Sequence, residues 1–556
     1  MKRYFLFLFV LLLSVPLWSQ IAPGKYFIQF TDKNNSPYTI DRPEEFLSAR
    51  ALARRARYHI SVKENDLPVN PQYVDSVMQT GVKILNRSRW LNGVTVYTTD
   101  TALIDSIRRF SFVKSTLKFA PARQQKDKFK KEAALPPGKA PVLKAANLSE
   151  ADYGAALTQI KQLNGIDLHK RGFLGQGMVI AVLDAGYSQV PTQPLFQKLR
   201  DENRILGTYD FVNPGGDVYP QHYHGRMVLS CMAADVPGVM IGTAPGASYW
   251  LLRSEDAASE NVIEEYNWVS AAEFADSVGA DIINSSLGYI DFDDTTYSHP
   301  YSDMNGKICI STRGAEIAAG KGILVVNSAG NSGDSQTFPW IGAPADGDSV
   351  LTVGAVTSAG VRASFSSIGP TYDGRIKPTV MAMGQGDAVA NATDSVTRAS
   401  GTSFSSPVLA GMSACLWEAH PKATNMQIIE ALKKTASFSG DPNSLMGWGI
   451  PDFVRADAYL TQTVGIASSR VSGNSLKVYP NPFQDGVSVS IPQPISGRIQ
   501  LTLFSMDGKK LFEKDFRPTG RRIFLRNAVV AHLLPGIYVL RLTGEGTRYF
   551  AKVIKK

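Results

Sequence analysis

The segment MVIAVLD, residues 178–184, is a short apolar run that ends in a carboxylate. Similar apolar, β-branched runs follow it, and helical stretches such as HGRMVLSCMAAD at 224–235 separate them. Strands that are apolar on both faces and alternate with helices indicate an α/β fold with a doubly wound parallel sheet. Such sheets place their sites at the carboxyl ends of the strands. The further runs are ASYWLLR at 247–253, ADIINSS at 280–286, GILVVNS at 322–328 and SVLTVGAV at 349–356.

The first 20 residues place Lys2 and Arg3 before an apolar run that ends in small polar residues. This layout predicts a secretory signal peptide, with a membrane anchor as the alternative. The run is short for a membrane span and no second run follows it, which favours export. Residues 21–118 are then predicted to form a small α+β module. Its elements are strands at 26–30 and 93–99 and helices at 43–58, 71–81 and 101–110, the last capped by Asp100.

The rest of the chain divides where the sequence pattern changes. A stretch rich in Lys, Ala and Pro predicts an exposed linker at 119–149, before the α/β domain at 150–462. A second linker is placed at 463–474. Residues 475–556 alternate in period two, with a turn at Asp507-Gly508, which predicts a small antiparallel β-sandwich.

The net charge of +9 is unevenly distributed along the 556 residues. Residues 21–149 carry 22 Lys and Arg against 11 Asp and Glu, whereas residues 150–465 carry 19 against 33 and residues 466–556 carry 15 against 5. This split suits attraction between the basic amino-terminal module and the acidic middle region better than binding to nucleic acid, which we do not expect. The three cysteines, Cys231, Cys309 and Cys415, have apolar neighbours. They are expected to be buried, inert thiols rather than a disulfide framework, a nucleophile or a metal site.

Four stretches of the α/β domain carry candidate chemistry. Asp184 follows a buried strand, His224 begins a helix, and Asn331 lies in a glycine-flanked turn after another strand. The fourth stretch is ASGTSFSSPVLAG at 399–411. Taken singly, these residues fit turns, caps or a surface histidine equally well. Taken together, they supply an orienting carboxylate, a base, an oxyanion donor and a serine nucleophile, in a chain order known for catalytic triads.

The domain resembles the subtilisin-like serine proteases, the subtilases or peptidase S8 family, over roughly residues 150–460. Six motifs in the family's order carry the resemblance, which implies a subtilisin-like parallel sheet. Three resemble the family's Asp, His and Ser motifs, and the others its substrate-binding strand, its oxyanion motif and the turn that often ends the domain. They are AVLDAGY at 181–187, HGRMVLSCMAA at 224–234, GTSFSSP at 401–407, SSLG at 285–288, NSAGN at 327–331 and GWGIPD at 447–452.

The resemblance implies a role for each of eight residues and a secreted serine endopeptidase that cleaves polypeptides through an acyl-enzyme. Ser403 is the implied nucleophile, His224 its base, Asp184 the group that orients the imidazole, and Asn331 the oxyanion donor. Ser286, Leu287 and Gly288 would bind an extended peptide, and Gly330 would line the pocket for the residue before the cut. Because Pro407 is tolerated only near a first turn, a helix is expected to begin around Ser403 to Ser406. Ser400, Ser405 and Ser406 are expected to serve as turn, capping or packing residues.

Some positions depart from the family pattern. Arg226 and Met227 replace the usual Thr and His, and Arg226 is expected to point into solvent, although it could restrict the site. Phe404 stands where the family often has Met, an apolar exchange. The loop at 289–306 carries four aspartates, Asp291, Asp293, Asp294 and Asp303. We interpret them as a solvated loop, with structural calcium as the alternative and no cofactor required.

The flanking regions resemble accessory domains of secreted proteases. Residues 21–118 resemble an inhibitory prodomain, released by cleavage in the 119–149 linker. YPNPF at 479–483 and GIYVLRL at 536–542 resemble the carboxy-terminal sorting domains of the Bacteroidetes type IX secretion system, and an accessory β-sandwich is the alternative. The expected partners are polypeptide substrates, the chain's own prodomain and the type IX machinery. The location is the cell surface or the exterior. An inactive subtilase scaffold that binds other molecules is the alternative function, and GTSFS does not fit the nucleophile elbow of an esterase.

Overall fold

We describe the chain from a computed structural model. The structure describes residues 24–119, 148–468, 476–490, 498–505, 510–517, 520, 522–526, 528–544 and 547–556. The predicted signal peptide, the first linker apart from its ends, and the Asp507-Gly508 turn lie outside these ranges. The chain divides into two compact units, Met1–Thr461 and Gln462–Lys556. None of the helices that the structure describes is both long and apolar enough to cross a membrane.

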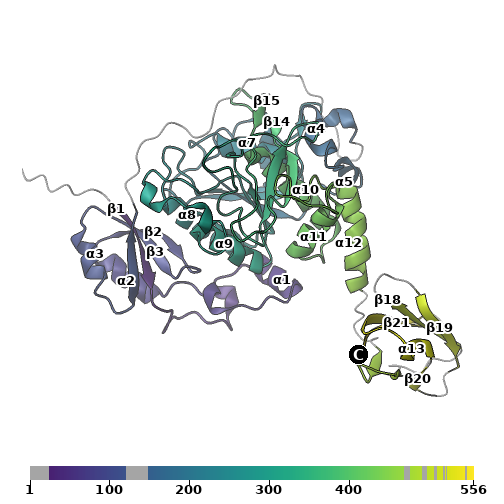
Figure 1. Ribbon diagram of the computed structural model, residues 1–556. Helices are drawn as coiled ribbons and strands as arrows, with labels where there is room; N and C mark the ends of the chain where they lie inside the picture. Colours follow the sequence, from purple (N-terminus) through teal and green to yellow (C-terminus); the bar gives the residue numbers. More distant parts are fainter. Residues whose placement is uncertain are drawn as a thin grey trace, which may run out of the picture. The chain divides into compact units, whose positions relative to one another are not determined.

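A seven-stranded parallel sheet forms the centre of the first unit and confirms the predicted fold class (Figure 1). Its strand order is β13-β12-β11-β10-β5-β9-β6, and the five predicted apolar runs form its five inner strands. The two outermost strands were not predicted. Each of these two strands pairs with a neighbour on one side only. The side chains of β6 are mostly half-exposed, so this strand lacks a continuous apolar run. The bounds are β5 Val179–Asp184, β6 Ile205–Asp210, β9 Ser248–Arg253, β10 Ile282–Ser285, β11 Leu324–Ser328, β12 Leu351–Val356 and β13 Val380–Met383.

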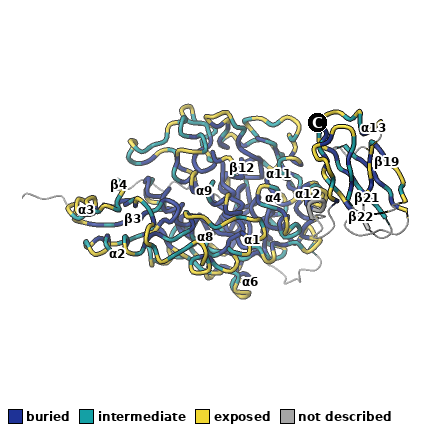
Figure 2. Tube along the Cα trace, turned by 90° about the horizontal axis from the view of Figure 1, so that it is seen from below, coloured by how far each residue is buried: buried dark blue, intermediate teal, exposed yellow. Residues whose placement is uncertain are grey.

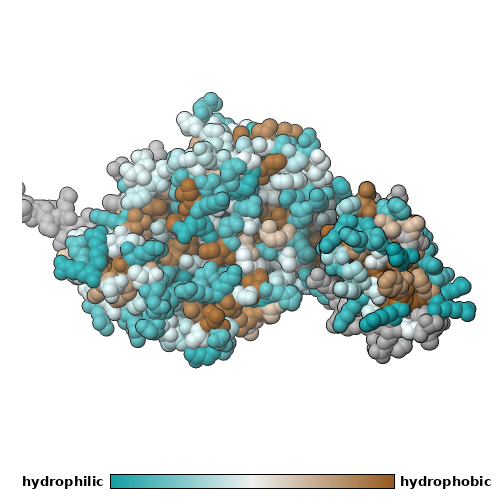
Figure 3. All heavy atoms as spheres, turned by 60° about the horizontal axis from the view of Figure 1, so that its bottom comes forward, coloured by the Kyte–Doolittle hydropathy of each residue, from teal (hydrophilic) through white to brown (hydrophobic). Residues whose placement is uncertain are grey.

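Helices cover both faces of this sheet. Helices α8 and α9 pack with Ala181, Leu183 and Ile283 into one large core, while α10 lies along the other face against β10 to β13 and contacts α7. Figure 2 shows the buried strands at the centre of the unit, and Figure 3 shows brown hydrophobic patches interspersed with hydrophilic surface. The main helices are α7 His224–Ala233, α8 Ile263–Val278, α9 Ile310–Gly320, α10 Thr402–Ala419, α11 Asn425–Thr435 and α12 Phe453–Ser468.

The amino-terminal module is a four-stranded antiparallel sheet of order β2-β3-β1-β4 with three α-helices. The helix predicted at 43–58 is divided, because Ser48 has an extended backbone and its side chain caps a new helix at Ala51 N. That helix, α1, belongs to a segment between β1 and α2, residues 31–70, which we call the arm. The module's elements are β1 Gly24–Phe30, α1 Ala49–Arg57, α2 Pro71–Gln79, β2 Lys83–Ser88, β3 Gly93–Thr98, α3 Ala102–Ile107 and β4 Val113–Lys118.

The second unit contains two antiparallel sheets that share one core, as predicted. Val489 of β17 and Leu525 of β20 pack in this core with Leu503 of β18 and Leu540 of β21. The predicted linker at 463–474 differs at its start, because α12 continues to Ser468. The strands are β16 Lys477–Tyr479, β17 Gly486–Ser490, β18 Ile499–Ser505, β19 Lys510–Phe516, β20 Arg522–Arg526, β21 Gly536–Gly544 and β22 Thr547–Lys555.

Candidate active site

The central sheet brings Asp184 and His224 together, although they lie 40 residues apart in sequence. Asp184 is the last residue of β5 and His224 the first residue of α7, and both are buried. The Nδ1 atom of His224 lies 2.7 Å from Oδ1 of Asp184. Oδ1 also accepts the N–H of Ala185. A carboxylate on Nδ1 fixes the orientation of the imidazole, so that Nε2 faces away from Asp184.

Gly225 explains how α7 can start so close to β5. A Cβ atom at this position would lie 2.4 Å from the carbonyl oxygen of Gly186 and 3.0 Å from Cβ of Asp184. Any side chain would therefore push the start of α7 away from the end of β5, and the pair of Asp184 and His224 would separate. Gly225 is therefore needed for the close contact between Asp184 and His224.

Ser403 lies in the first turn of α10, one residue after the helix begins at Thr402. The ring of Phe404 lies 6.1 Å from the ring of His224, which brings the start of α10 next to His224. Ser403 is almost buried, with 8% of its surface exposed, and its Oγ lies 3.4 Å from the carbonyl oxygen of Ser286. The helix begins one residue earlier than predicted, so Pro407 is its sixth residue.

Asn331 follows β11, and its side-chain orientation is set by Thr402. The Oδ1 atom of Asn331 accepts hydrogen bonds from the backbone N–H and from the hydroxyl of Thr402, both at 2.9 Å. Because the carbonyl end of the amide faces Thr402, the Nδ2 donors point in another direction. The neighbouring Gly330 has a φ of +102°, which favours glycine, and its N–H contacts the same Thr402 hydroxyl.

The predicted substrate-binding residues continue from the end of β10. Ser286 and Leu287 are buried, whereas Gly288 is exposed and offers its backbone to solvent. Asn327 of β11 fixes the segment, because its Nδ2 donates to the carbonyl oxygen of Leu287 at 3.0 Å. The segment therefore lies beside the start of α10, with its backbone fixed by Asn327.

The structure also assigns contacts that the sequence interpretation missed. Ser286 donates its hydroxyl hydrogen to the carbonyl oxygen of Ser403 at 2.9 Å, and Ser406 donates to Oδ1 of Asn284 at the same distance. Pro407 was the available signal for the first contact. A proline has no N–H, so the carbonyl four residues earlier needs another donor.

The expectation for Arg226 was wrong. Its side chain is buried and does not point into solvent, because Nη1 donates to the carbonyl oxygen and hydroxyl of Ser188 and to Oε1 of Gln189. Burial lowers the pKa of this guanidinium from its ordinary value. Arg226 thus ties α7 to the loop after Asp184, which is a structural contact.

Three of the four aspartates of the 289–306 loop have separate contacts in the structure. Asp294 caps the short helix at Thr295–Tyr297, Asp293 accepts the N–H of Glu260, and Asp303 contacts His299. The three cysteines are all buried free thiols.

Comparison with known proteins places this geometry in a family. Residues 175–449 match the subtilase family. The α/β domain of this chain belongs to the subtilases. Residues 25–134 match the peptidase S8 propeptide domain of Bacteroidota, and residues 477–556 match the secretion system C-terminal sorting domain. The prodomain and sorting-domain resemblances are thereby confirmed.

Individual relatives are similar over about half of the chain. Subtilisin NAT from Bacillus subtilis subsp. natto is 30% identical over 285 residues, which are 51% of this chain and 66% of that protein. Subtilisin from Bacillus pumilus is 29% identical over 284 residues, 50% of this chain and 91% of that protein. The solved structure of the prenylagaramide maturation protease PagA has 23% identity and a TM-score of 0.42, and covers 54% of this chain and 98% of that chain.

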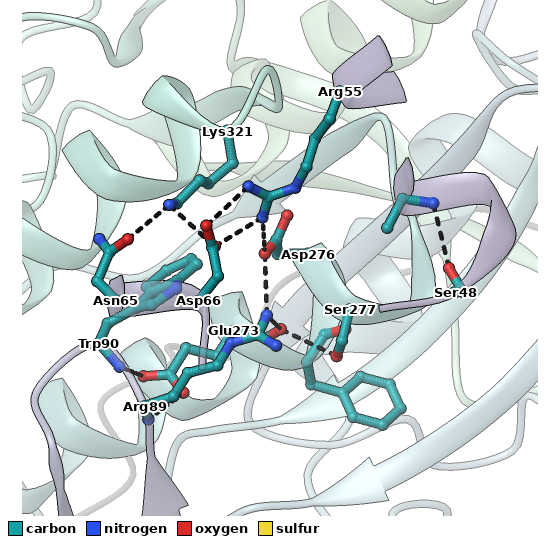
Figure 4. Close-up of polar contacts among 12 residues, drawn as sticks. Ser48, Arg55, Asn65, Asp66, Arg89, Trp90, Glu273, Asp276, Ser277 and Lys321 are labelled. Carbon is teal, nitrogen blue, oxygen red and sulfur yellow. Dashed lines mark hydrogen bonds and ion pairs between the residues drawn. The ribbon is translucent and has the colours of Figure 1, made fainter. Parts of the chain in front are cut away.

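The propeptide binds this subtilase domain through buried charges on α8 (Figure 4). Glu273 accepts hydrogen bonds from the Ser88 hydroxyl and from the backbone N–H groups of Arg89 and Trp90. Burial raises the pKa of Glu273, although these bonds and the charge of Arg89 oppose the shift. The contact joins the end of β2 to the middle of α8.

The arm makes a second group of contacts with the same domain. Arg55 reaches Asp276 at 2.7 Å and Asp66 of the arm itself at 2.9 Å, and Lys321 contacts Asp66 at 2.9 Å (Figure 4). Arg54 reaches the other Asp276 oxygen at 2.5 Å. These side chains are 5% exposed or less. The predicted attraction between a basic module and an acidic domain thus corresponds to buried ion pairs, and the basic residues of α1 that form them are not surface residues.

Proposed function

We propose that the chain is a secreted serine endopeptidase that hydrolyses peptide bonds through Ser403. The main support for this proposal is the buried contact of 2.7 Å between Asp184 and His224. This contact lies next to the amino-terminal turn of α10, where Ser403 lies. Membership in the subtilases supports a serine peptidase, and the sorting domain supports secretion.

In the proposed reaction, Nε2 of His224 takes the proton of the Ser403 hydroxyl as Oγ attacks the peptide carbonyl. Asp184 stays ionised and stabilises the imidazolium that forms. His224 then gives the proton to the leaving amine, which leaves an acyl group on Ser403. A water molecule, deprotonated by His224, hydrolyses this ester and restores the serine.

The negative charge on the tetrahedral intermediate needs donors aimed at it. Nδ2 of Asn331 is the proposed side-chain donor, because Thr402 already holds the carbonyl end of that amide. The N–H groups in the first turn of α10 add a favourable field for a negative oxygen.

We propose that the peptide substrate binds as an added strand along Ser286, Leu287 and Gly288, with Gly330 at the pocket for the residue before the cut. Exposed backbone at Gly288 supports this mode, because an extended peptide gains affinity from main-chain hydrogen bonds. The propeptide is proposed to block the site until the linker at 119–149 is cut, and the sorting domain to direct export by type IX secretion to the cell surface or the exterior. Amino-terminal sequencing of secreted, active protein tests this. A start near Ile21 with full activity would contradict the maturation step.

Active-site labelling tests the catalytic proposal directly. A fluorophosphonate probe should label the matured protein once, and the label should be lost in Ser403→Ala and His224→Ala. Ser400→Ala, a serine three residues from the proposed nucleophile, is the control and should label normally. Matured wild-type protein without label would favour an inactive scaffold.

A further inference from the structure

Three potential metal ligands lie close together near the loop that follows the proposed substrate-binding segment, residues 286–288. Glu265 lies in the first turn of α8, His299 in the loop after Gly288, and Cys309 directly before α9. Glu265 and Cys309 are buried, with 0% and 1% of their surfaces exposed, and the His299 side chain is 13% exposed. Their ligand atoms all lie within 4.8 Å of one another.

His299 has a carboxylate oxygen beside each of its two ring nitrogens. Its Nε2 lies 3.0 Å from Oε2 of Glu265, and its Nδ1 lies 3.3 Å from Oδ2 of Asp303. In zinc sites one ring nitrogen binds the metal and the other donates its hydrogen to a carboxylate, which fixes the ring. Ser311 holds the other Glu265 oxygen, Oε1, through its N–H and its hydroxyl. Oε2 and Nε2 therefore face each other, and the Cys309 sulfur lies within 4.8 Å of a ligand atom of each residue.

A neutral histidine cannot satisfy both carboxylates. It has one N–H, so one ring nitrogen would face a carboxylate oxygen with no hydrogen between them. A second proton on the ring or on one of the carboxyl groups, or a metal ion at Nε2, removes this mismatch. The position of Cys309 favours the metal, since its sulfur lies within 4.8 Å of a ligand atom of each of the other two residues and a thiolate is a strong zinc ligand.

We propose that Cys309 Sγ, His299 Nε2 and Glu265 Oε2 bind a Zn²⁺ ion, with Asp303 as the group that positions the histidine. A mixed sulfur, nitrogen and oxygen set matches zinc, whereas calcium and magnesium require oxygen ligands. Zn²⁺ displaces the thiol proton and any proton on Nε2, so the affinity rises with pH. At Cys309 the proposal replaces the inert thiol expected from the sequence.

The ion would brace the loop between the substrate-binding segment and α9. The loop starts at Tyr289, whose N–H donates to the carbonyl oxygen of Ala343, and its His299 N–H donates to the carbonyl oxygen of Ile290. A Zn²⁺ ion would add a link from this loop to α8 and α9. The proposal goes beyond the proposed protease function and does not depend on it.

The test uses the full chain with Ser403→Ala, which removes the proposed nucleophile and hence self-cleavage. The metal-free protein is titrated with Co²⁺, which absorbs in the near ultraviolet when a thiolate binds it, and with Zn²⁺ followed by dialysis and metal analysis. We expect about one equivalent of each ion. Cys309→Ser should abolish the thiolate absorption, and His299→Gln should weaken zinc binding by roughly 100-fold or more. Cys231→Ser, which removes a buried thiol elsewhere, is the matched control and should behave as the parent.

Absence of the cobalt absorption in the parent chain would overturn the proposal, and so would absorption that survives Cys309→Ser. The parent titration decides the question even if a variant fails to fold, and circular dichroism identifies such a variant. Failure here would leave the protease proposal intact, because no measurement in this experiment depends on activity.

Discussion

The hydroxyl of Ser286 donates a hydrogen bond of 2.9 Å to the backbone carbonyl of Ser403. In an uninterrupted helix this carbonyl would accept the N–H of residue 407, which is a proline and has none. The proposed substrate-binding segment therefore supplies the hydrogen bond that the helix lacks at the proposed nucleophile. The contact links the segment that we propose binds the peptide to the position of Ser403.

Ser286→Ala should reduce both stability and activity. The buried carbonyl of Ser403 loses its donor, which costs about 1–3 kcal/mol. We expect kcat to fall roughly 10-fold, since a small displacement of a reacting group has a large effect on rate. Denaturant unfolding and peptide hydrolysis by the matured enzyme measure the two effects.

Pro407→Ala supplies the control for this prediction, because the substitution restores a backbone N–H that can donate to the Ser403 carbonyl. The double variant should recover most of the stability and activity lost in Ser286→Ala. A double-mutant cycle in which the free-energy changes of the two substitutions are additive would contradict this coupling.

Asn331→Ala should lower kcat by about 10²–10³ with little change in KM, a magnitude known for loss of one oxyanion donor in a subtilisin. Asn331→Asp keeps an oxygen for Thr402 but lacks the Nδ2 donors, so it should be at least as impaired. Steady-state kinetics of both matured variants test this. An active Asn331→Asp enzyme would rule out the donor role.

Thr402→Val should show whether the orientation of Asn331 matters. The variant keeps the backbone N–H contact but loses the hydroxyl contact to Oδ1, so we expect a loss in kcat smaller than that of Asn331→Ala, roughly 10-fold. Hydrolysis of the same peptide by the matured variant measures it. If Thr402→Val is fully active, the backbone contact alone is sufficient to hold the amide.

The sequence predicted the parts of this chain that depend on local pattern. Inner strands of a parallel sheet are buried on both faces, so β5 and β11 appear as continuous apolar runs, and Asp184 and Asn331 follow from the ends of these two strands. Edge strand β6 lacks that signal because most of its side chains are half-exposed. The predicted helix start near Ser403 was late by at least one residue because Pro407 was assumed to need a first-turn position.

Contacts between distant segments could not be predicted in this way. Arg226 is buried because the loop at Ser188 supplies its acceptors, and nothing next to it in sequence indicates this. The same holds for Arg55, which looks like one of several surface arginines on α1 until Asp276 is placed opposite it. Charge totals predicted the attraction between the two domains but not the residues that form it.

Arg55→Met should loosen the propeptide in the Ser403→Ala chain. It leaves Asp276 and Asp66 buried with one cation fewer, and loss of one member of a buried ion pair costs about 3–5 kcal/mol. Hydrogen exchange of the amides in α1 should then accelerate by roughly 100-fold or more, since opening becomes easier by that free energy. Arg57→Met, at an exposed position of the same helix, is the control, and equal exchange in both variants would contradict the prediction.

Lys377 should make the matured subtilase domain more stable as pH rises above neutrality. The side chain is buried, with its Nζ 2.6 Å from the carbonyl oxygen of Val350, and burial lowers its pKa from 10.5 to about 7. Between these values the unfolded chain binds more protons than the folded one. The free energy of unfolding contributed by this lysine therefore rises with pH, by up to about 1.4 kcal/mol per unit.

This slope is measured by denaturant unfolding of the enzyme after reaction with the fluorophosphonate probe, which prevents self-cleavage. The measurement covers roughly pH 7 to 9, within the interval between the two pKa values. Lys377→Met should lose the slope, whereas Lys434→Met, at an exposed site, should keep it. Parallel curves for wild type and Lys377→Met would show that Lys377 stays charged in the folded protein, because a lysine that keeps its proton on folding contributes no dependence on pH in this interval.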